Sequence, residues 1–273
     1  MTETIYKQGR IINGDCLDIM DELIKEGIKV DCVIADLPYN TTACKWDKEV
    51  INLEEMWAKL NKLTKDNTPI VMFGSQPFTT KLISSNIKNF REEIIWLKNK
   101  AGSGLQAKQK HIKIHENILV FSKSGSYTFK PQKWGVEEKE FLTQRKTFKE
   151  VEVGNNIYSK MTKTQKVDDG TRNPVSIVSY RVPFTPSKSK TYSKEIDIRI
   201  HETQKPLKLL EYLINSFSNQ NELVLDITAG SMSLAHACIN TNRRFICIEK
   251  DEHYYNVGIN RINNCIEDIK DEP

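Results

Sequence analysis

Hydrophobic and polar positions in the first 122 residues follow two alternating patterns. Apolar runs typical of buried strands occupy residues 10–15, 30–36, 69–74, 92–97 and 116–123. Apolar side chains recur at helical spacing over residues 16–27 and 53–65. This alternation of strand and helix patterns predicts a mostly parallel, doubly wound α/β sheet.

The same rhythm returns near the end of the chain. Helical spacing covers residues 205–217, 231–241 and 251–269, and strand-like runs occupy residues 222–227 and 244–250. We expect these strands to join the sheet of the first region. Residues 1–122 and 200–273 would then form one discontinuous domain.

Residues 123–199 have a different character. They show no sustained period, are rich in Ser, Thr, Lys and aromatic residues, and carry 16 basic and 9 acidic side chains in a protein of net charge +4. This composition predicts an inserted, loop-rich basic module, which suits a polyanionic partner. A solvated charged insertion without a partner is the alternative interpretation.

Composition narrows the class of protein further. The chain of 273 residues with 38% hydrophobic content can bury a substantial core, and no apolar run approaches the ~20 residues of a membrane span. The N-terminus lacks the apolar core of a signal peptide, so we expect a cytoplasmic protein without a membrane partner. Six scattered cysteines without a CxxC pair predict no metal site.

Two predicted strands in the last region have an acidic residue near their ends. Asp226 lies near the end of the run 222–227, TAGS and a helix follow, and Glu249 lies near the end of the next strand. This arrangement can hold a nucleoside cofactor, because the second acid can accept both ribose hydroxyls. An ordinary βαβ turn is the alternative, and the absence of GxGxxG argues against NAD.

Two earlier strands also end on carboxylates. Asp15 follows the first strand, and it either caps the next helix or contacts a ligand. Asp36 precedes Leu37, Pro38 and Tyr39 at the edge where doubly wound sheets bind ligands. Pro38 biases Leu37 toward extended geometry, which aims the Leu37 carbonyl. The carboxylate, this carbonyl and the tyrosine ring suit a planar base with an exocyclic amine.

These segments together resemble the β group of amino-methylating DNA methyltransferases, which use S-adenosylmethionine. VIADLPYN resembles the DPPY motif, INGD the motif whose acid contacts the cofactor adenine, IHENILVFSK the following shared strand, and HETQKPLKLLEYLI the H-x-T-x-K-P helix. VLDITAGSMS resembles the cofactor motif LDPFxGSGT, and FICIEKDEHY resembles the ribose-binding strand end. The order of the motifs also matches this group, over nearly the whole chain outside 123–199.

The resemblance implies a Rossmann-like methyltransferase sheet with helices on both faces, which acts on a base flipped out of double-stranded DNA. It places the base amine against the catalytic residues Asp36, Leu37, Pro38 and Tyr39. It assigns S-adenosylmethionine to Asp15, Cys16, Thr203, Lys205, Asp226, Thr228, Gly230, Ser231, Glu249 and Lys250. The basic insertion becomes a target-recognition region, and we expect DNA contacts from Lys98, Lys100, Lys108, Arg145, Arg172 and Arg181. A solvated loop is the alternative for the lysines.

The sequence departs from the family pattern at three positions. Leu37 replaces the first proline of the catalytic motif, where the family uses the backbone carbonyl. Thr228 replaces phenylalanine and Met232 replaces the second glycine of the cofactor motif, so we expect the shape of the methionine pocket to differ.

The resemblance also implies the target base, because family members with an aspartate at the position of Asp36 mostly methylate adenine. We therefore predict site-specific adenine N6 methylation of DNA. Methylation of the cytosine exocyclic amine, methylation of RNA, and an inactive DNA-binding protein of the same fold are the alternatives. A homodimer and a restriction endonuclease counterpart are compatible with the resemblance, although no residue demonstrates either.

Overall fold

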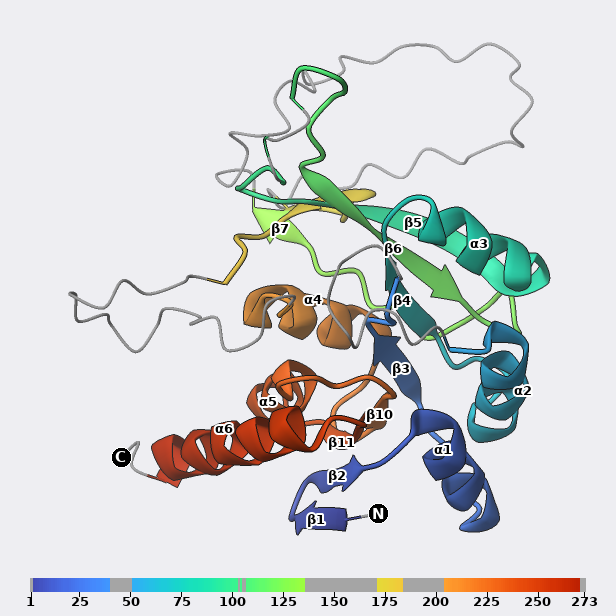
Figure 1. The fold of residues 1–273 in the computed structure, drawn as a ribbon, viewed down its shortest axis with the longest axis vertical. Coiled ribbons are helices and arrows are strands. Elements are labelled where there is room, and N and C mark those ends of the chain that lie inside the picture. The colour runs from blue at the N-terminus through green and yellow to red at the C-terminus, as the bar shows by residue number, and fades with distance from the viewer. Residues whose placement is uncertain are drawn as a thin grey trace, which may run out of the picture. The chain divides into compact units, whose positions relative to one another are not determined.

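A computed structural model describes residues 2–39, 51–102, 104, 107–135, 171–183 and 204–270. The chain divides into two compact units, one of residues Met1–Lys130 with Ser176–Pro273 and the other of residues Pro131–Val175. The first unit holds a nine-stranded sheet with helices on both faces (Figure 1).

The helices and strands of this unit alternate along most of the chain. The strands are β1 (Thr2–Tyr6), β2 (Gly9–Asn13), β3 (Cys32–Ala35), β4 (Ile70–Gly74), β5 (Phe90–Leu97), β6 (His115–Phe121), β9 (Ile177–Ser179), β10 (Leu223–Asp226) and β11 (Arg244–Glu249). The helices are α1 (Cys16–Lys25), α2 (Leu53–Leu63), α3 (Phe78–Ser85), α4 (Leu207–Phe217), α5 (Ser233–Asn240) and α6 (Glu252–Lys270), with a 3₁₀ turn η2 (Ile87–Asn89).

The order of the strands across the sheet is β1-β2-β11-β10-β3-β4-β6-β5-β9. Among these described strands, β1 runs antiparallel to β2 and β6 runs antiparallel to both of its neighbours, while the other pairs are parallel. The neighbours β3 and β10 continue in opposite directions, because β3 leads to β4 and β10 leads to β11. They therefore form the topological switch point at which doubly wound sheets bind ligands.

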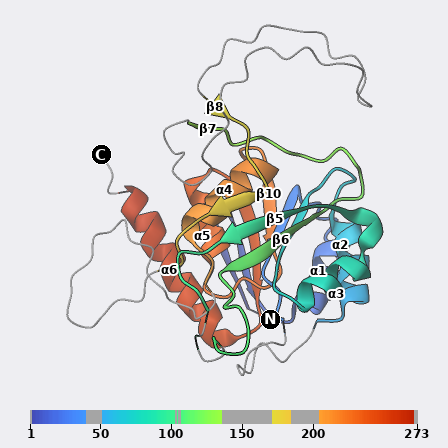
Figure 2. The same ribbon diagram turned by 90° about the horizontal axis from the view of Figure 1, so that it is seen from above.

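Both faces of the sheet are buried under helices (Figures 1 and 2). Val33 and Ala35 of β3 pack in one cluster with residues of α1, α2 and α3, whereas Cys32 and Ile34 pack in another with residues of α4, α5 and α6. Successive side chains of a strand point to opposite faces, so a strand covered on both faces must be apolar throughout. This explains the continuous apolar runs of the sequence.

The predicted doubly wound α/β class is confirmed, and each predicted helix and strand is present with somewhat different ends. In the segment HIKIH, where apolar and polar residues alternate, only the last residue, His115, lies in β6. The sequence patterns did not reveal β1, α3 or β9. In the described part of the chain no helix is long and apolar enough to cross a membrane.

The compact second unit is shorter than the insertion expected over residues 123–199. Strand β9 lies inside that range but pairs in parallel with β5, and the backbone N–H of Lys130 donates to the carbonyl of Ser216 in α4 at 2.7 Å. The described part of Pro131–Val175 contains β7 (Trp134–Gly135), which pairs antiparallel with β8 (Thr171–Arg172). Recognition of a target by residues 123–199 stays a prediction.

Candidate active site

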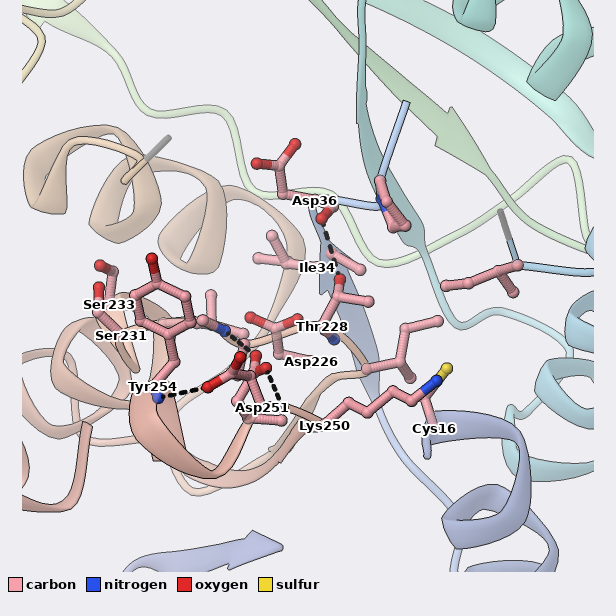
Figure 3. A pocket seen from close by; sticks show the side chains of 18 of the residues that line it. Cys16, Ile34, Asp36, Asp226, Thr228, Ser231, Ser233, Lys250, Asp251 and Tyr254 are labelled. Carbon is pink, nitrogen blue, oxygen red and sulfur yellow. Dashed lines mark hydrogen bonds between the residues drawn. The ribbon is translucent and has the colours of Figure 1, made fainter. Parts of the chain in front are cut away.

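A cavity of about 710 Å³ lies at the ends of β2, β3, β10 and β11, on both sides of the switch point (Figure 3). Its volume is within the range of sites for small molecules and cofactors. The predicted site residues that line it are Asp15, Cys16, Asp36, Pro38, Lys205, Asp226, Thr228, Gly230, Ser231, Glu249 and Lys250. The topology thus brings together residues that are up to 235 positions apart in the sequence, because parallel strands end at the same edge of the sheet.

Other predicted residues lie elsewhere. The side chain of Leu37 is buried in the core that α1, α2 and α3 cover, so only its backbone is available for the predicted role. Tyr39 is not part of the cavity wall, but its hydroxyl donates to Oδ1 of Asp36 at 2.5 Å. Thr203 and Arg145 lie outside the described residues.

The wall of the cavity is acidic. Five carboxylates and two lysines line it, so its electrostatic potential favours a cation. Burial raises the pKa of Asp226 to about 8, and the neighbouring charges of Asp36 and Glu249 add to this effect, while the backbone N–H of Thr228 opposes it. A positively charged group in the cavity would therefore offset the cost of ionising Asp226.

Glu249 organises the turn between β10 and α5. Its two carboxylate oxygens accept backbone N–H groups, one from Asp251 at 2.8 Å and one from Gly230 at 2.7 Å. Gly230 has a φ of +53°, a left-handed conformation that suits glycine, and a Cβ at this position would meet no atom within 4 Å. The backbone is thus open to the cavity at Gly230. Burial raises the pKa of Glu249.

Asp15 caps a helix and also faces the cavity. It is the N-cap of α1, where Oδ1 accepts the backbone N–H of Leu17 at 2.9 Å. It also lines the cavity, and Nζ of Lys250 lies 3.4 Å from Oδ2. Capping of the helix therefore does not exclude contact with a ligand.

Asp36 is held by two side chains, one on each oxygen. Oδ1 accepts the Tyr39 hydroxyl, and Oδ2 pairs with the ammonium group of Lys205. Burial alone lowers the pKa of Lys205, but the charges of Asp36 and Glu116 outweigh it, so the net shift of this pKa is upward. Lys205 therefore carries its charge inside the protein. Lys205 was predicted to contact the cofactor; it lines the cavity and also binds the carboxylate of Asp36.

An extended charge network supports this pair. Oε2 of Glu116 lies 3.5 Å from Nζ of Lys205, while Oε1 pairs with Lys98. Burial of Glu116 raises the pKa of this residue, but the two lysines reverse the effect and leave that pKa lowered. The network runs from Lys98, just after β5, through Glu116 of β6 and the buried Lys205 to Asp36, so charge pairs hold this side of the cavity in place.

Tyr39 has an aromatic support. Its ring stacks on that of Phe78, the first residue of α3, with centroids 5.1 Å apart and an interplanar angle of 24°. Phe78 is buried in the core beneath α3. One face of the tyrosine ring is thus covered by protein.

Thr228 and Met232, the two departures in the cofactor motif, differ in their relation to the cavity. Thr228 lines it, and its hydroxyl donates to the backbone carbonyl of Asp36 at 3.1 Å (Figure 3). Met232 is fully buried and is not part of the wall. A Cβ added at Gly258 of α6 would lie 2.2 Å from Cγ of Met232, so the methionine fills space that this glycine leaves.

The basic residues predicted to contact DNA have different surroundings. Lys98 pairs with Glu116 and lies 4.8 Å from the ring centroid of Trp96, an arrangement that does not favour a phosphate contact. Lys100, Lys108 and Arg181 are exposed. Arg172 belongs to the second unit and donates to the carbonyl of Thr171.

Several residues of the wall were not predicted. Asp251 and Tyr254 follow Glu249 at the start of α6, and Phe73 comes from β4. The polar run DEHY, one residue after the strand-end acid Glu249, was the available signal for the first two. Phe73 reads as an ordinary core residue in the sequence, so nothing there marks it. No group of three His, Cys, Asp or Glu side chains in the described ranges could hold a metal ion.

Known proteins are similar to this chain over most of its length. The family model described as DNA methylase matches residues 30–260. DNA adenine methyltransferase YhdJ of Escherichia coli (strain K12) is 28% identical, over 93% of this chain and 82% of its own. Type II methyltransferase M1.MboII of Moraxella bovis is also 28% identical, over 90% of this chain and 94% of its own.

Solved structures share the fold. The crystal structure of the M1.HpyAVI–SAM complex matches with a TM-score of 0.61 and 22% identity, over 93% of this chain and 99% of that chain. The PvuII DNA methyltransferase, which is cytosine-N4-specific, matches with a TM-score of 0.59 and 14% identity, over 95% of this chain and 91% of that chain.

Proposed function

Because the chain belongs to the DNA methylase family, we propose that it methylates the exocyclic N6 amine of adenine in double-stranded DNA, with S-adenosylmethionine as the methyl donor. The observation that carries the proposal is the convergence of Asp36, Asp226 and Glu249 at one switch point. Asp36, whose carboxylate would accept the amine, and Pro38 line this acidic cavity of cofactor size, which supports the proposal.

The residues of the cavity fit S-adenosylmethionine. When bound, this cofactor supplies a methyl group on a positively charged sulfur. The acidic wall favours such a cation, and Asp226, whose burial makes ionisation costly, would gain a partner for its carboxylate. Glu249 retains acceptor capacity for ribose hydroxyls, because each carboxylate oxygen can accept more than one hydrogen bond. Asp15 would contact the adenine of the cofactor.

The catalytic loop would hold the base. Oδ1 of Asp36 and the carbonyl of Leu37 would accept the two N–H groups of the amine, which leaves the nitrogen lone pair directed at the methyl group. Tyr39, already supported by Phe78, would stack on the flipped base. Such positioning of two reactants can lower a barrier by roughly 7–11 kcal/mol in favourable cases.

Adenine is favoured over cytosine on two grounds. Asp36 occupies the position where the family has mostly aspartate in adenine enzymes. The relative YhdJ, named a DNA adenine methyltransferase, is 28% identical over 93% of this chain. The cytosine-N4-specific PvuII enzyme supports only the common fold, at 14% identity.

Three further parts of the proposal concern partners. Residues 123–199, with 16 basic side chains, would recognise the target sequence through phosphate and base contacts. The exposed Lys100 and Lys108 would contact phosphates. A homodimer and a restriction endonuclease counterpart stay predictions, the second supported by the type II methyltransferase M1.MboII among the relatives.

Transfer of a labelled methyl group tests the proposal. The purified protein is incubated with methyl-labelled S-adenosylmethionine and either amplified, unmodified bacterial genomic DNA or total RNA. We expect label on DNA, loss of label with Asp36→Ala, and retention with Asp66→Ala, since the Asp66 side chain is 94% exposed. Folded protein that labels no DNA would favour the inactive DNA-binding alternative, and label on RNA alone would favour the RNA alternative.

A further inference from the structure

Thr228 connects the cofactor turn to the catalytic loop. Its hydroxyl donates to the backbone carbonyl of Asp36 at 3.1 Å across the switch point, although the two residues are 192 positions apart. Its own backbone N–H donates to Oδ1 of Asp226 at 3.0 Å. The side chain therefore starts from a fixed position and reaches the peptide group that joins Asp36 to Leu37 (Figure 3).

This peptide group lies beyond the support of the sheet. The pairing of β3 with β4 ends at Ala35 and Met72, and its pairing with β10 ends at Val33 and Leu225. Asp36 is the first residue after the strand, so no ladder partner orients its carbonyl. The hydroxyl of Thr228 orients the Asp36 carbonyl in place of a neighbouring strand.

Leu37 makes such support necessary. A proline at this position would fix φ near −65°, but leucine leaves φ free to vary. Pro38 biases Leu37 toward extended geometry but still leaves its φ a range of about 80°. The direction of the Leu37 carbonyl depends on both angles and on the orientation of the preceding peptide. A restraint on the Asp36 carbonyl therefore supplies what a ring at position 37 would otherwise supply.

We propose that Thr228 is a positioning residue, whose hydroxyl orients the Asp36–Leu37 peptide and thereby aims the Leu37 carbonyl at the amine that receives the methyl group. This inference rests on the proposed function. It also links two of the three departures from the family pattern, because the leucine that removes a rigid ring and the threonine that adds a hydroxyl meet at one peptide group.

Variants that separate the hydroxyl from the rest of the side chain test this role. Thr228→Val keeps the branched shape and removes the donor, whereas Thr228→Ser keeps the donor. We expect Thr228→Val to lower the single-turnover rate of methyl transfer at saturating S-adenosylmethionine roughly three- to tenfold, the worth of one hydrogen bond. Thr228→Ser should restore most of this rate. The dissociation constant for S-adenosylmethionine, measured by calorimetry, should stay close to that of the wild type.

Thr241→Val is the matched control. Thr241, like Thr228, is half-buried, and its hydroxyl donates to the Ala237 carbonyl at 2.6 Å, away from the cavity. This variant should transfer methyl groups at the wild-type rate. Equal effects of both valine variants would overturn the proposal, since they would indicate a general loss of stability.

A double-variant cycle links Thr228 to Leu37. The folding of the Leu37→Pro protein is checked by circular dichroism. In this background, Thr228→Val should lower the single-turnover rate of methyl transfer by a smaller factor than in the wild-type background. If Leu37→Pro does not fold, the comparison of valine with serine at position 228 decides. The proposal is overturned if Thr228→Val transfers as fast as the wild type, if serine behaves like valine, or if only cofactor affinity falls. A wild-type protein without any transfer would instead count against the proposed function.

Discussion

The ammonium group of Lys205 is paired with Oδ2 of Asp36, 169 positions earlier in the chain. Lys205 is 7% exposed, lies 3.5 Å from Oε2 of Glu116, and stands 4.9 Å from the ring centroid of Phe73. Two carboxylates and an aromatic ring thus offset the cost of burying this cation. The segment that enters α4 is thereby fixed to the carboxyl end of β3.

Lys205→Met should be inactive and less stable. Methionine has a similar length but no charge, so the half-buried carboxylates of Asp36 and Glu116 lose their common partner. Breaking a fully buried pair costs about 3–5 kcal/mol, and the loss here should be smaller, because Tyr39 and Lys98 still contact these carboxylates. Urea unfolding and methyl transfer measure the two effects. Lys208→Met is the control, because Lys208 is 81% exposed and pairs with Glu211 at 2.9 Å. An active Lys205→Met protein would contradict a role for this pair.

Phe78→Leu should weaken the binding of the flipped base and leave the binding of the cofactor unchanged. The Tyr39 ring rests on Phe78, and an aromatic pair contributes about 0.5–1.5 kcal/mol beyond area burial. We expect a higher KM for DNA and an unchanged dissociation constant for S-adenosylmethionine, since Phe78 does not line the cavity. Phe90→Leu is the control, because it removes the Phe90–Phe121 edge contact on the same face. Equal KM values for both variants would show that Phe78 acts only through general packing.

Asp226 gives the folded protein a pH dependence of defined sign. Its pKa is raised from the ordinary 3.8 to about 8 in the ligand-free protein, chiefly by burial. The folded state therefore binds this proton more tightly than the unfolded state, so the contribution of Asp226 to stability falls between these two pH values and is constant above them. Asp226→Asn, which keeps an oxygen for the Thr228 N–H, should lose this part of the dependence.

Urea unfolding at several pH values checks the sign. The free energy of unfolding of Asp226→Asn should exceed that of the wild type by a margin that grows from pH 5 to pH 8. Saturating S-adenosylmethionine should narrow the margin, because a cation bound at the carboxylate favours its ionised form. Parallel pH profiles for the two proteins would show that Asp226 is not perturbed by burial.

Gly258→Ala should destabilise the protein through Met232. The new Cβ would lie 2.2 Å from Cγ of Met232, and overpacking of a core costs about 1–3 kcal/mol, which outweighs the ~1 kcal/mol that alanine gains in a helix. Met232→Ala removes the clashing atom, so the loss caused by Gly258→Ala should shrink in that background. Thermal unfolding of the four proteins measures this coupling, and additive effects would refute it.

The sequence predicts that the ends of the strands lie close together. It does not predict which side chains contact one another there. The apolar runs before Asp36, Asp226 and Glu249 indicate parallel strands, and parallel strands place their ends at one edge. The pairing of Lys205 with Asp36 depends on how the segment before α4 packs on the sheet, which periodicity does not encode. The reversed direction of β6 was hidden for the same reason, because an apolar run carries no sign of direction.

Met232 illustrates a limit of comparison with a motif. Its side chain was expected to alter the cofactor pocket, because a glycine of the family pattern is replaced. The structure instead packs it against Gly258, whose sequence position gives no hint of this contact. A substitution inside a motif was thus accommodated by a distant residue, which only the packing of α6 reveals.

Analysis of the modified nucleosides in the DNA of a bacterial host tests the proposed target base and the proposed catalytic role of Asp36 together. A bacterial strain without DNA methyltransferases of its own would express the wild type, Asp36→Ala or Asp66→Ala, and its DNA would be digested and analysed by mass spectrometry. We predict N6-methyladenine with the wild type and with Asp66→Ala, and none with Asp36→Ala. N4-methylcytosine, unmodified DNA from the folded wild type, or N6-methyladenine from Asp36→Ala would contradict this account.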